Sequence, residues 1–288
     1  MDGAPIKDVS DTAFWVAQLR AEESERPDAL FHDPLAGRLA GEHGRKIAAA
    51  MPMSRWVGWS VSMRTCIIDE YIHFAIRAGV DTILNLGAGL DARPYRMDLP
   101  AALQWIEADY PQILDYKERV LAAEQPRCRL SRMRADLGER AQRQELLAAI
   151  GLHATKTLIL TEGVLPYLSV EEVAALAHDL RAWEPARYWV VDYFHPAVMR
   201  FRRRGRMGRA LRNAAFRFAP PDWFGFFERH GWKPREIRYL AEQSRLAARP
   251  VPMPPWVKVA IAVGRLFVGA ERADPFRKLM GYVLLEPS

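Results

Sequence analysis

Four short stretches of this sequence place glycines or carboxylates directly after an apolar run. They are NLGAGLDARPYR at 85–96, WIEADYP at 105–111, MRADLGER at 133–140 and LTEGVLP at 160–166. Glycine lets a backbone approach a ligand closely, and a carboxylate accepts hydrogen bonds from hydroxyl or amino groups. In an open α/β sheet, ligands bind beyond the carboxyl ends of the strands, so these stretches predict one ligand site at that edge.

The glycine loop at 87–92 is compatible with several ligands. Gly87, Gly89 and Ala92 fit the minimal dinucleotide pattern, whereas a nucleoside-triphosphate loop would need Gly-Lys-Ser/Thr and here a leucine and Asp91 follow Gly89. A tight turn without any ligand is the other interpretation. Asp91 would repel a pyrophosphate, and Pro94 lies where a long phosphate-facing helix should begin. An acidic loop better suits a cofactor with an amine and a sulfonium, such as S-adenosylmethionine.

Acidic residues at the next three strand ends support a nucleoside cofactor. Glu107 and Asp109 follow the first loop glycine by 20 and 22 residues and share a face of the strand, where one of them could hold ribose hydroxyls or merely be solvated. Asp136 could accept from an adenine amino group beside the Leu137 backbone, or cap the following helix. Glu162 follows a buried strand, so it needs a cationic partner, which a sulfonium or ammonium would supply.

The elements around these stretches alternate between strands and helices from residue 79 onward. The predicted strands are Thr82–Leu86, Gln104–Ala108, Arg129–Arg134, Thr157–Thr161, Tyr188–Tyr193, Pro234–Arg238 and Gly281–Leu285. The predicted helices between them are Pro111–Ala123, Glu139–Ile150, Val170–Ala182 and Asp222–His230. Ser169 and Glu172 form a predicted capping box. This alternation predicts an α/β fold, a mostly parallel sheet covered on both faces with right-handed crossovers.

The rest of the chain is predicted to cover this core. Residues 1–78 read as a helical cap, with helices over Thr12–Glu22, Leu35–Ala50 and Val61–Ala78. Residues 79–288 form the core, and its two long connections, near 195–221 and 240–279, are interpreted as lid insertions. We predict one structural unit rather than separate domains.

The sequence resembles the leucine carboxyl methyltransferase family, and more closely its bacterial polyketide-type O-methyltransferases. The matching stretches are ESERPDALFHDPLA, MRTCIIDEYI, NLGAGLDARPYR, EADYP, RADL, LTEGVLPYL and the GW at 231–232. They occur in the family's order and cover nearly the whole chain, least firmly between about 195 and 280. The resemblance implies a class I S-adenosylmethionine-dependent methyltransferase with a Rossmann-like, seven-stranded, mostly parallel sheet.

The resemblance also assigns roles to matched positions. Those expected at the cofactor are Arg64, Gly87, Ala88, Gly89, Asp91, Glu107, Asp109, Asp136, Leu137 and Glu162. Arg64 would bind the methionine carboxylate through its paired guanidinium donors, and Glu162 would lie near the methionine amine. Asp109 would hold the ribose hydroxyls, with Glu107 buttressing the loop. Tyr167 would lie at the substrate end.

Methyl transfer requires an aligned nucleophile and exclusion of water. A carboxylate acceptor is ionised at neutral pH and needs no base, whereas a phenol benefits from one. His195 is the candidate base, with Asp192 as its orienting partner, and a purely structural role for His195 is the alternative. Because the resembling family is best known for methyl esters, we expect a small carboxylic acid as acceptor. Trp223, Phe224, Phe226 and Phe227 could line its pocket or pack in the core.

Composition narrows the remaining function classes. The chain has 288 residues, with 41 Lys and Arg against 35 Asp and Glu, and much of the excess lies in the basic run 200–212. That run could be a solvated face, a lid over an anionic substrate or a nucleic-acid contact, and no nucleic-acid motif accompanies it.

Other features of the sequence set expectations about location and partners. No apolar stretch is long enough to span a membrane, no secretory signal is evident, and two cysteines without metal-type spacing predict no metal site, so we expect a cytoplasmic protein. A nicotinamide oxidoreductase and a non-catalytic cofactor-binding partner are the alternative functions. The oligomeric state cannot be read from the sequence.

Overall fold

A single seven-stranded sheet organises the chain in the computed structural model, which describes residues 5–202, 205–253 and 277–288. Its strands are β1 Thr82–Leu86, β2 Gln104–Asp109, β3 Arg129–Arg134, β4 Thr157–Leu160, β5 Ala186–Phe194, β6 Trp232–Tyr239 and β7 Met280–Pro287. The spatial order is β3-β2-β1-β4-β5-β7-β6, and only β7 runs antiparallel to its neighbours. The predicted mostly parallel sheet is confirmed. Because the strand order reverses between β1 and β4, the ligand-binding crevice should open there.

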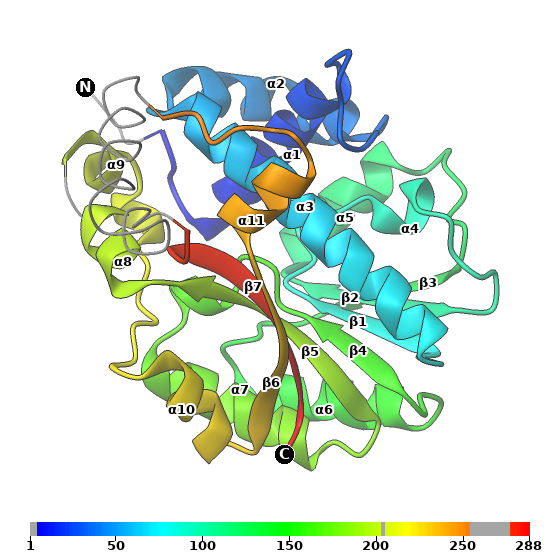
Figure 1. The fold of residues 1–288 in the computed structure, drawn as a ribbon. Coiled ribbons are helices and arrows are strands. Elements are labelled where there is room, and N and C mark those ends of the chain that lie inside the picture. The colour runs from blue at the N-terminus through cyan, green and yellow to red at the C-terminus, as the bar shows by residue number, and fades with distance from the viewer. Residues whose placement is uncertain (1–4, 203–204, 254–276) are drawn as a thin grey trace.

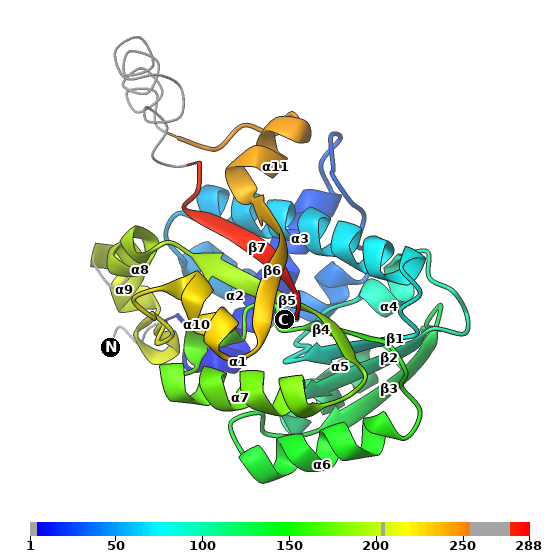
Figure 2. The ribbon, with the colours of Figure 1, turned by 60° about the horizontal axis from the view of Figure 1, so that its bottom comes forward.

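Helices cover both faces of this sheet, as Figure 2 shows. Their bounds are α1 Val9–Ser24, α2 Ala36–Ala50, α3 Ser54–Arg77, α4 Arg93–Arg96, α5 Pro111–Val120, α6 Arg140–Gly151, α7 Val170–Ala182, α8 Pro196–Arg202, α9 Gly205–Ala210, α10 Trp223–Arg229 and α11 Leu240–Leu246. Two short 3-10 turns, Leu165–Tyr167 and Arg212–Ala214, complete the set. The capping box of Ser169 and Glu172 forms at the start of α7 as predicted.

Alternation along the strands divides the core into two layers. Leu84 and Leu86 of β1 pack with α6, α7 and α10, whereas Ile83 packs with α3 and α11 on the opposite face. Because β1 is buried along its whole length, apolar residues are needed on both faces, which explains why Ile83, Leu84 and Leu86 do not follow the alternation of a half-exposed strand.

The N-terminal helices lie beside the sheet, with α1 and α2 packed against each other and α3 crossing one face (Figure 1). The connection after β5 carries α8 and α9, and the connection after β6 carries α11. The remainder of the second connection, 254–276, lies outside the described residues, as do 203–204 of the basic run. Within the described ranges, no helix combines the length and apolar character needed to cross a bilayer. Cys66 and Cys128 are free thiols, so no disulfide joins them.

Candidate active site

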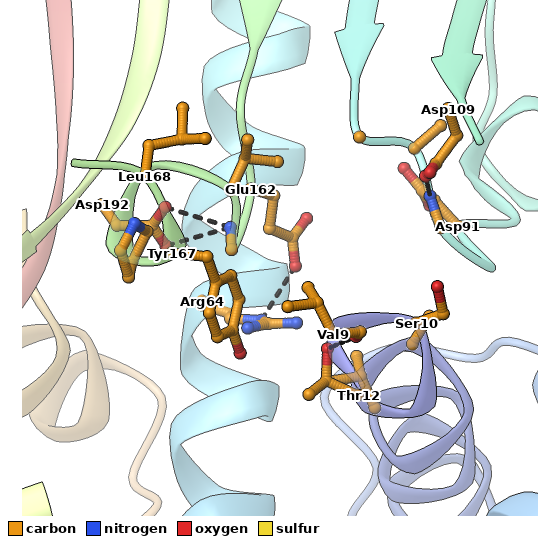
Figure 3. A pocket seen from close by; sticks show the side chains of 18 of the residues that line it. Val9, Ser10, Thr12, Arg64, Asp91, Asp109, Glu162, Tyr167, Leu168 and Asp192 are labelled. Carbon is orange, nitrogen blue, oxygen red and sulfur yellow. Dashed lines mark hydrogen bonds and ion pairs between the residues drawn. The ribbon is translucent and has the colours of Figure 1, made fainter. Parts of the chain in front are cut away.

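A cavity of about 580 Å³ opens at the carboxyl edge of β1, β2, β4 and β5. The predicted site residues that line it are Arg64, Gly87, Ala88, Gly89, Asp91, Asp109, Asp136, Leu137, Glu162 and Tyr167. Figure 3 shows Arg64 pointing from α3 toward Glu162, with Tyr167 beside them, and Asp91 and Asp109 across the cavity. Most of the predicted site residues therefore lie together, as expected because parallel strands present their ligand-binding loops at one edge of the sheet.

The glycine loop follows β1 with a backbone that favours glycine at two positions. Gly87 and Gly89 have φ values of +70° and +48°, and a side chain at Gly87 would collide with Val164. The loop then enters α4, a single helical turn with Pro94 in its first turn. A long phosphate-facing helix is thus absent after β1, as Asp91 and Pro94 predicted.

Asp109 is a buried carboxylate fixed at the end of β2. Its Oδ2 accepts from the Gly89 backbone N–H at 2.6 Å, and its Oδ1 accepts from the Tyr110 N–H at 2.7 Å. Burial raises its pKa above the usual value for aspartate, although both N–H groups oppose the rise. A carboxylate offers about four lone-pair sites, so Asp109 keeps acceptor capacity for hydroxyl groups of a ligand in the cavity.

Asp136 forms a tight turn rather than a helix cap. Its Oδ1 accepts from the Gly138 N–H at 2.8 Å, while α6 begins only at Arg140 with Glu139 preceding it. The interpretation of Asp136 as the N-cap of α6 is therefore wrong, because the helix starts too late in the chain. Asp136 and Leu137 both line the cavity.

Glu162 is held between two arginines. Its Oε1 lies 2.8 Å from Arg64 Nε, and its Oε2 accepts from Arg93 Nη1 at 2.7 Å. Burial opposes its ionisation, but Arg93 and Arg64 outweigh that effect and hold the pKa of Glu162 below its usual value. The cationic partner that Glu162 requires is thus present in the protein itself.

Arg93 is a site residue that the sequence analysis missed. Its Nε donates to Asp69 at 2.6 Å, and its Nη1 donates to Asp91 at 2.8 Å as well as to Glu162. Its side chain is 3% exposed, and despite burial the three carboxylates raise its pKa well above the usual value. Arg93 therefore fixes two of the predicted cavity carboxylates, Asp91 and Glu162, relative to α3.

Asp192 and Tyr282 form a second buried polar pair at the cavity. Asp192 accepts from the Gly163 N–H at 3.0 Å and from the Tyr282 hydroxyl at 2.8 Å. Burial raises the pKa of Asp192 to about 6, although Tyr282 and Arg64 oppose the rise. The predicted role of Asp192 as the orienting partner of His195 is not supported, because no hydrogen bond or ion pair joins the two side chains in the part of the chain that the structure describes.

Two predicted site residues do not line this cavity. His195 is exposed, and its Nδ1 accepts from the Ala197 N–H at 3.2 Å. Glu107 is fully buried, and its carboxylate accepts from Lys117 Nζ at 2.7 Å and Arg132 Nε at 2.8 Å. Its carboxylate ties β2 to α5 and β3 instead of facing the cavity. These positions support neither a base at His195 nor a ligand contact by Glu107.

Replacing Asp192 with asparagine is expected to stabilise the protein, and to do so more at alkaline than at acidic pH. The folded-state pKa, about 6, exceeds the unfolded value of 3.8, so folding favours the protonated acid and stability falls as pH rises between these values. Asparagine removes that ionisation and keeps an acceptor oxygen for Gly163 and Tyr282. Urea denaturation should show a gain of about 3 kcal/mol at pH 8 and about half of that at pH 5, because pH 5 lies between the two pKa values. An equal change at both pH values would contradict this linkage.

The chemistry of the lining residues decides which cofactor fits. Carboxylates outnumber cations in this lining: the carboxylates are Asp91, Asp109, Asp136, Glu139, Glu162, Glu172 and Asp192, and the cations are Arg20, Arg64 and Arg217. Such a lining repels phosphate and favours a cationic ligand. Arg64 Nε–H is buried and has no hydrogen-bond partner among the described residues, because its ion pair with Glu162 is not aligned. A buried guanidinium beside a carboxylate matches the paired charges of an amino-acid group, so these residues fit S-adenosylmethionine.

Comparisons with known proteins agree with this geometry. The family model described as leucine carboxyl methyltransferase matches residues 13–181. A protein of Parafrankia sp. named “Putative S-adenosyl-L-methionine-dependent methyltransferase” is 33% identical over 92% of this chain and 87% of its own length. A relative with the same descriptive name from Streptomyces avermitilis is 32% identical over 85% of this chain and 89% of its own length.

Solved structures share the fold at low sequence identity. A structure described as a “putative methyltransferase” from Thermobifida fusca superposes with a TM-score of 0.57 at 15% identity, covering 99% of this chain and 96% of that one. A DUF574 family protein from Streptomyces avermitilis superposes with a TM-score of 0.55 at 16% identity, covering 94% and 97%. The sheet and its covering helices are thus a Rossmann-like methyltransferase fold.

Proposed function

Because the chain belongs to the leucine carboxyl methyltransferase family and is an S-adenosylmethionine-dependent methyltransferase, we propose that it methylates the carboxylate oxygen of a small-molecule acceptor. One observation carries the choice of a carboxylate. His195, the base that a phenol would require, lies outside the cavity that holds the predicted cofactor residues. A carboxylate is already ionised at neutral pH and needs no base.

The cavity residues suggest how this chain would hold the cofactor, which supplies a methyl group activated by its sulfonium. Asp109 would accept from the ribose hydroxyls, and Asp136 would accept from the adenine amino group beside Leu137. The adjacent charges of Arg64 and Glu162 would bind the carboxylate and ammonium of the methionine part, respectively. The supporting facts are the acceptor capacity that Asp109 keeps beyond its two backbone contacts and the pairing of Arg64 with Glu162 at the cavity wall.

The helical parts of the chain would then exclude water from the reaction. Val9, Ser10 and Thr12 of α1 line the cavity, so we interpret residues 1–78 as a cap over it. The segments near 195–221 and 240–279 are proposed as lid insertions in the same structural unit. Excluding water protects the activated methyl group from hydrolysis and strengthens the electrostatic contacts inside.

Methylation of a phenol is the second candidate. Asp192 lines the cavity and has a pKa of about 6, so it is ionised near neutral pH and could accept a proton from a phenol. Its contacts with Gly163 and Tyr282 leave it a remaining lone pair.

The stability of the product to alkali separates the two candidates. The purified chain is first titrated calorimetrically with S-adenosylhomocysteine and, as a control, with NAD, and we expect micromolar binding of the thioether only. It is then incubated with the labelled cofactor and with hydroxybenzoic and hydroxynaphthoic acids, which offer both a carboxylate oxygen and a phenol oxygen. We expect label that mild alkali releases as methanol, because a methyl ester hydrolyses and an aryl ether does not. Label that survives alkali would replace the carboxylate with the phenol.

A further inference from the structure

A second cavity, of about 560 Å³, adjoins the first at the end of β5. Pro166, Asp192 and Phe194 line both cavities. The other apolar side chains around the second cavity are Tyr193, Pro196, Met199, Phe218, Ala219, Pro220, Pro221, Trp223 and Phe224. Its size lies within the range typical of pockets for small organic ligands.

The walls of this second cavity are aromatic and already packed. The Tyr193 ring stacks on Phe224 with centroids 5.4 Å apart and meets Trp223 edge-on at 5.3 Å. Trp223 and Phe224 are only half-buried, whereas Phe226 and Phe227 are buried in the core. The four aromatic residues at 223–227 thus divide into two lining residues and two core residues. Aromatic faces held by their neighbours form a pre-set surface for another flat ring.

Charge in the second cavity indicates what part of a ligand it suits. Its ionisable lining residues are Asp192, His195 and Asp222, and no arginine or lysine lines it among the described residues. An anionic group would meet carboxylates there without a compensating cation. The cavity therefore suits a neutral apolar body, and the anionic end of a ligand should lie elsewhere.

The two cavities share a continuous wall near Tyr167. The Pro166 carbonyl accepts from the Arg217 N–H at 2.7 Å and from the Phe218 N–H at 3.3 Å, which ties the turn bearing Tyr167 to the second cavity. The Phe216 ring contacts the Tyr167 ring, with centroids 5.2 Å apart. The wall between the two cavities is thus shared by Pro166 of this turn and by Asp192 and Phe194 of β5.

We infer that the second cavity holds the aromatic ring system of the methyl acceptor, whose reactive oxygen reaches past Asp192 and Phe194 into the first cavity. This inference rests on the proposed function and narrows its acceptor to acids with a flat aryl or polycyclic body. In this orientation, the apolar part of the acceptor packs against Tyr193, Trp223 and Phe224. Its charged end lies in the first cavity, whose lining includes Arg20 and Arg217 beside the Arg64 assigned to the cofactor.

The test uses 2-naphthoic acid as the aryl probe and butanoic acid as a probe with the same carboxylate but no ring. Each is titrated calorimetrically into the full chain saturated with S-adenosylhomocysteine. We expect binding of 2-naphthoate and no measurable binding of butanoate. Phe224→Ala and Trp223→Leu should each weaken 2-naphthoate binding by about fivefold to tenfold, because each removes one aromatic contact. S-adenosylhomocysteine affinity should stay within about twofold, since neither residue lines the first cavity.

Phe74→Ala is the matched control, because Phe74 is also a half-buried helical phenylalanine but lines neither cavity. It should leave both affinities unchanged, which separates loss of a contact from general loosening. Failure of 2-naphthoate to bind a chain that binds S-adenosylhomocysteine would overturn the inference and leave the proposed function standing. Equal 2-naphthoate affinity of the wild type and of both cavity variants would also overturn the inference and leave the proposed function standing. Failure of S-adenosylhomocysteine itself to bind would instead refute the proposed function.

Discussion

Replacing Arg93 with methionine is expected to lower the free energy of unfolding by about 3–5 kcal/mol. Arg93 is buried and contacts Asp69, Asp91 and Glu162, so its loss leaves buried carboxylates without their counter-charge. Methionine retains much of the apolar stem, which limits the cavity left behind. Urea denaturation at pH 7.5 measures the loss, and S-adenosylhomocysteine affinity should fall more than about tenfold because Asp91 and Glu162 are no longer held in place.

Arg134→Met provides the matched control for this prediction. Arg134 also bridges two carboxylates, at 2.7 Å from Asp115 and 2.6 Å from Glu118, but its side chain is 40% exposed. Exposed pairs contribute little, so the loss should be at most about 1 kcal/mol, and cofactor affinity should not change. Similar losses for the two variants would mean that burial does not set the importance of the Arg93 network.

The strands could be predicted from the sequence because buried strands leave an apolar pattern in it. β1 and β4 are buried on both faces, and their apolar runs mark them as inner strands of a parallel sheet. The predicted strand ends were less accurate at β5 and β6, which extend by one or two residues at either end beyond the predicted ranges. The start of β5 pairs with β4, whereas the end of β5 and both ends of β6 pair with β7, and a pairing of distant segments leaves no local sequence signal.

From the residues themselves the site was predictable where it depends on strand ends, and Arg64 on α3 was expected only through the family resemblance. Asp109, Asp136 and Glu162 each follow a strand, so topology alone brings them to one cavity. Arg93 stands in the glycine-loop motif, but its partners Asp69 and Glu162 lie 24 and 69 residues away along the chain. Such contacts depend on how α3 packs on the sheet, which no local pattern records.

His195 shows how one residue of strand length changes a functional assignment. β5 continues through Phe194, one residue beyond its predicted end. Side chains alternate along a strand, so Asp192 and Phe194 reach the first cavity, while Tyr193 and His195 line only the second. The missed partner of Asp192, Tyr282, comes from β7, which is distant in sequence and antiparallel to β5.

Asp109 and Glu107 are two residues apart on β2, and their substitutions are expected to have opposite effects. Asp109→Ala removes the acceptor proposed for two ribose hydroxyls and should weaken S-adenosylhomocysteine binding by about 100-fold, since hydrogen bonds to a charged group contribute about 1.5–3 kcal/mol each. Its effect on stability should be small, because burial already raises the pKa of this carboxyl and disfavours its charge. Calorimetry measures the affinity, and thermal unfolding confirms the fold.

Glu107→Gln should lower stability strongly and leave the affinity for S-adenosylhomocysteine nearly unchanged. Lys117 and Glu107 are both fully buried, so the substitution leaves an ammonium group in the interior without its counter-charge, and the free energy of unfolding should fall by about 3–5 kcal/mol. The folded fraction should still bind S-adenosylhomocysteine within about twofold of the wild-type affinity, because Glu107 faces α5 and β3 rather than the cavity. If Glu107→Gln instead weakened binding as strongly as Asp109→Ala at a temperature where both variants are folded, the ribose assignment to Asp109 alone would be wrong. The two carboxylates would then act together, with Glu107 setting the position of the loop through Lys117.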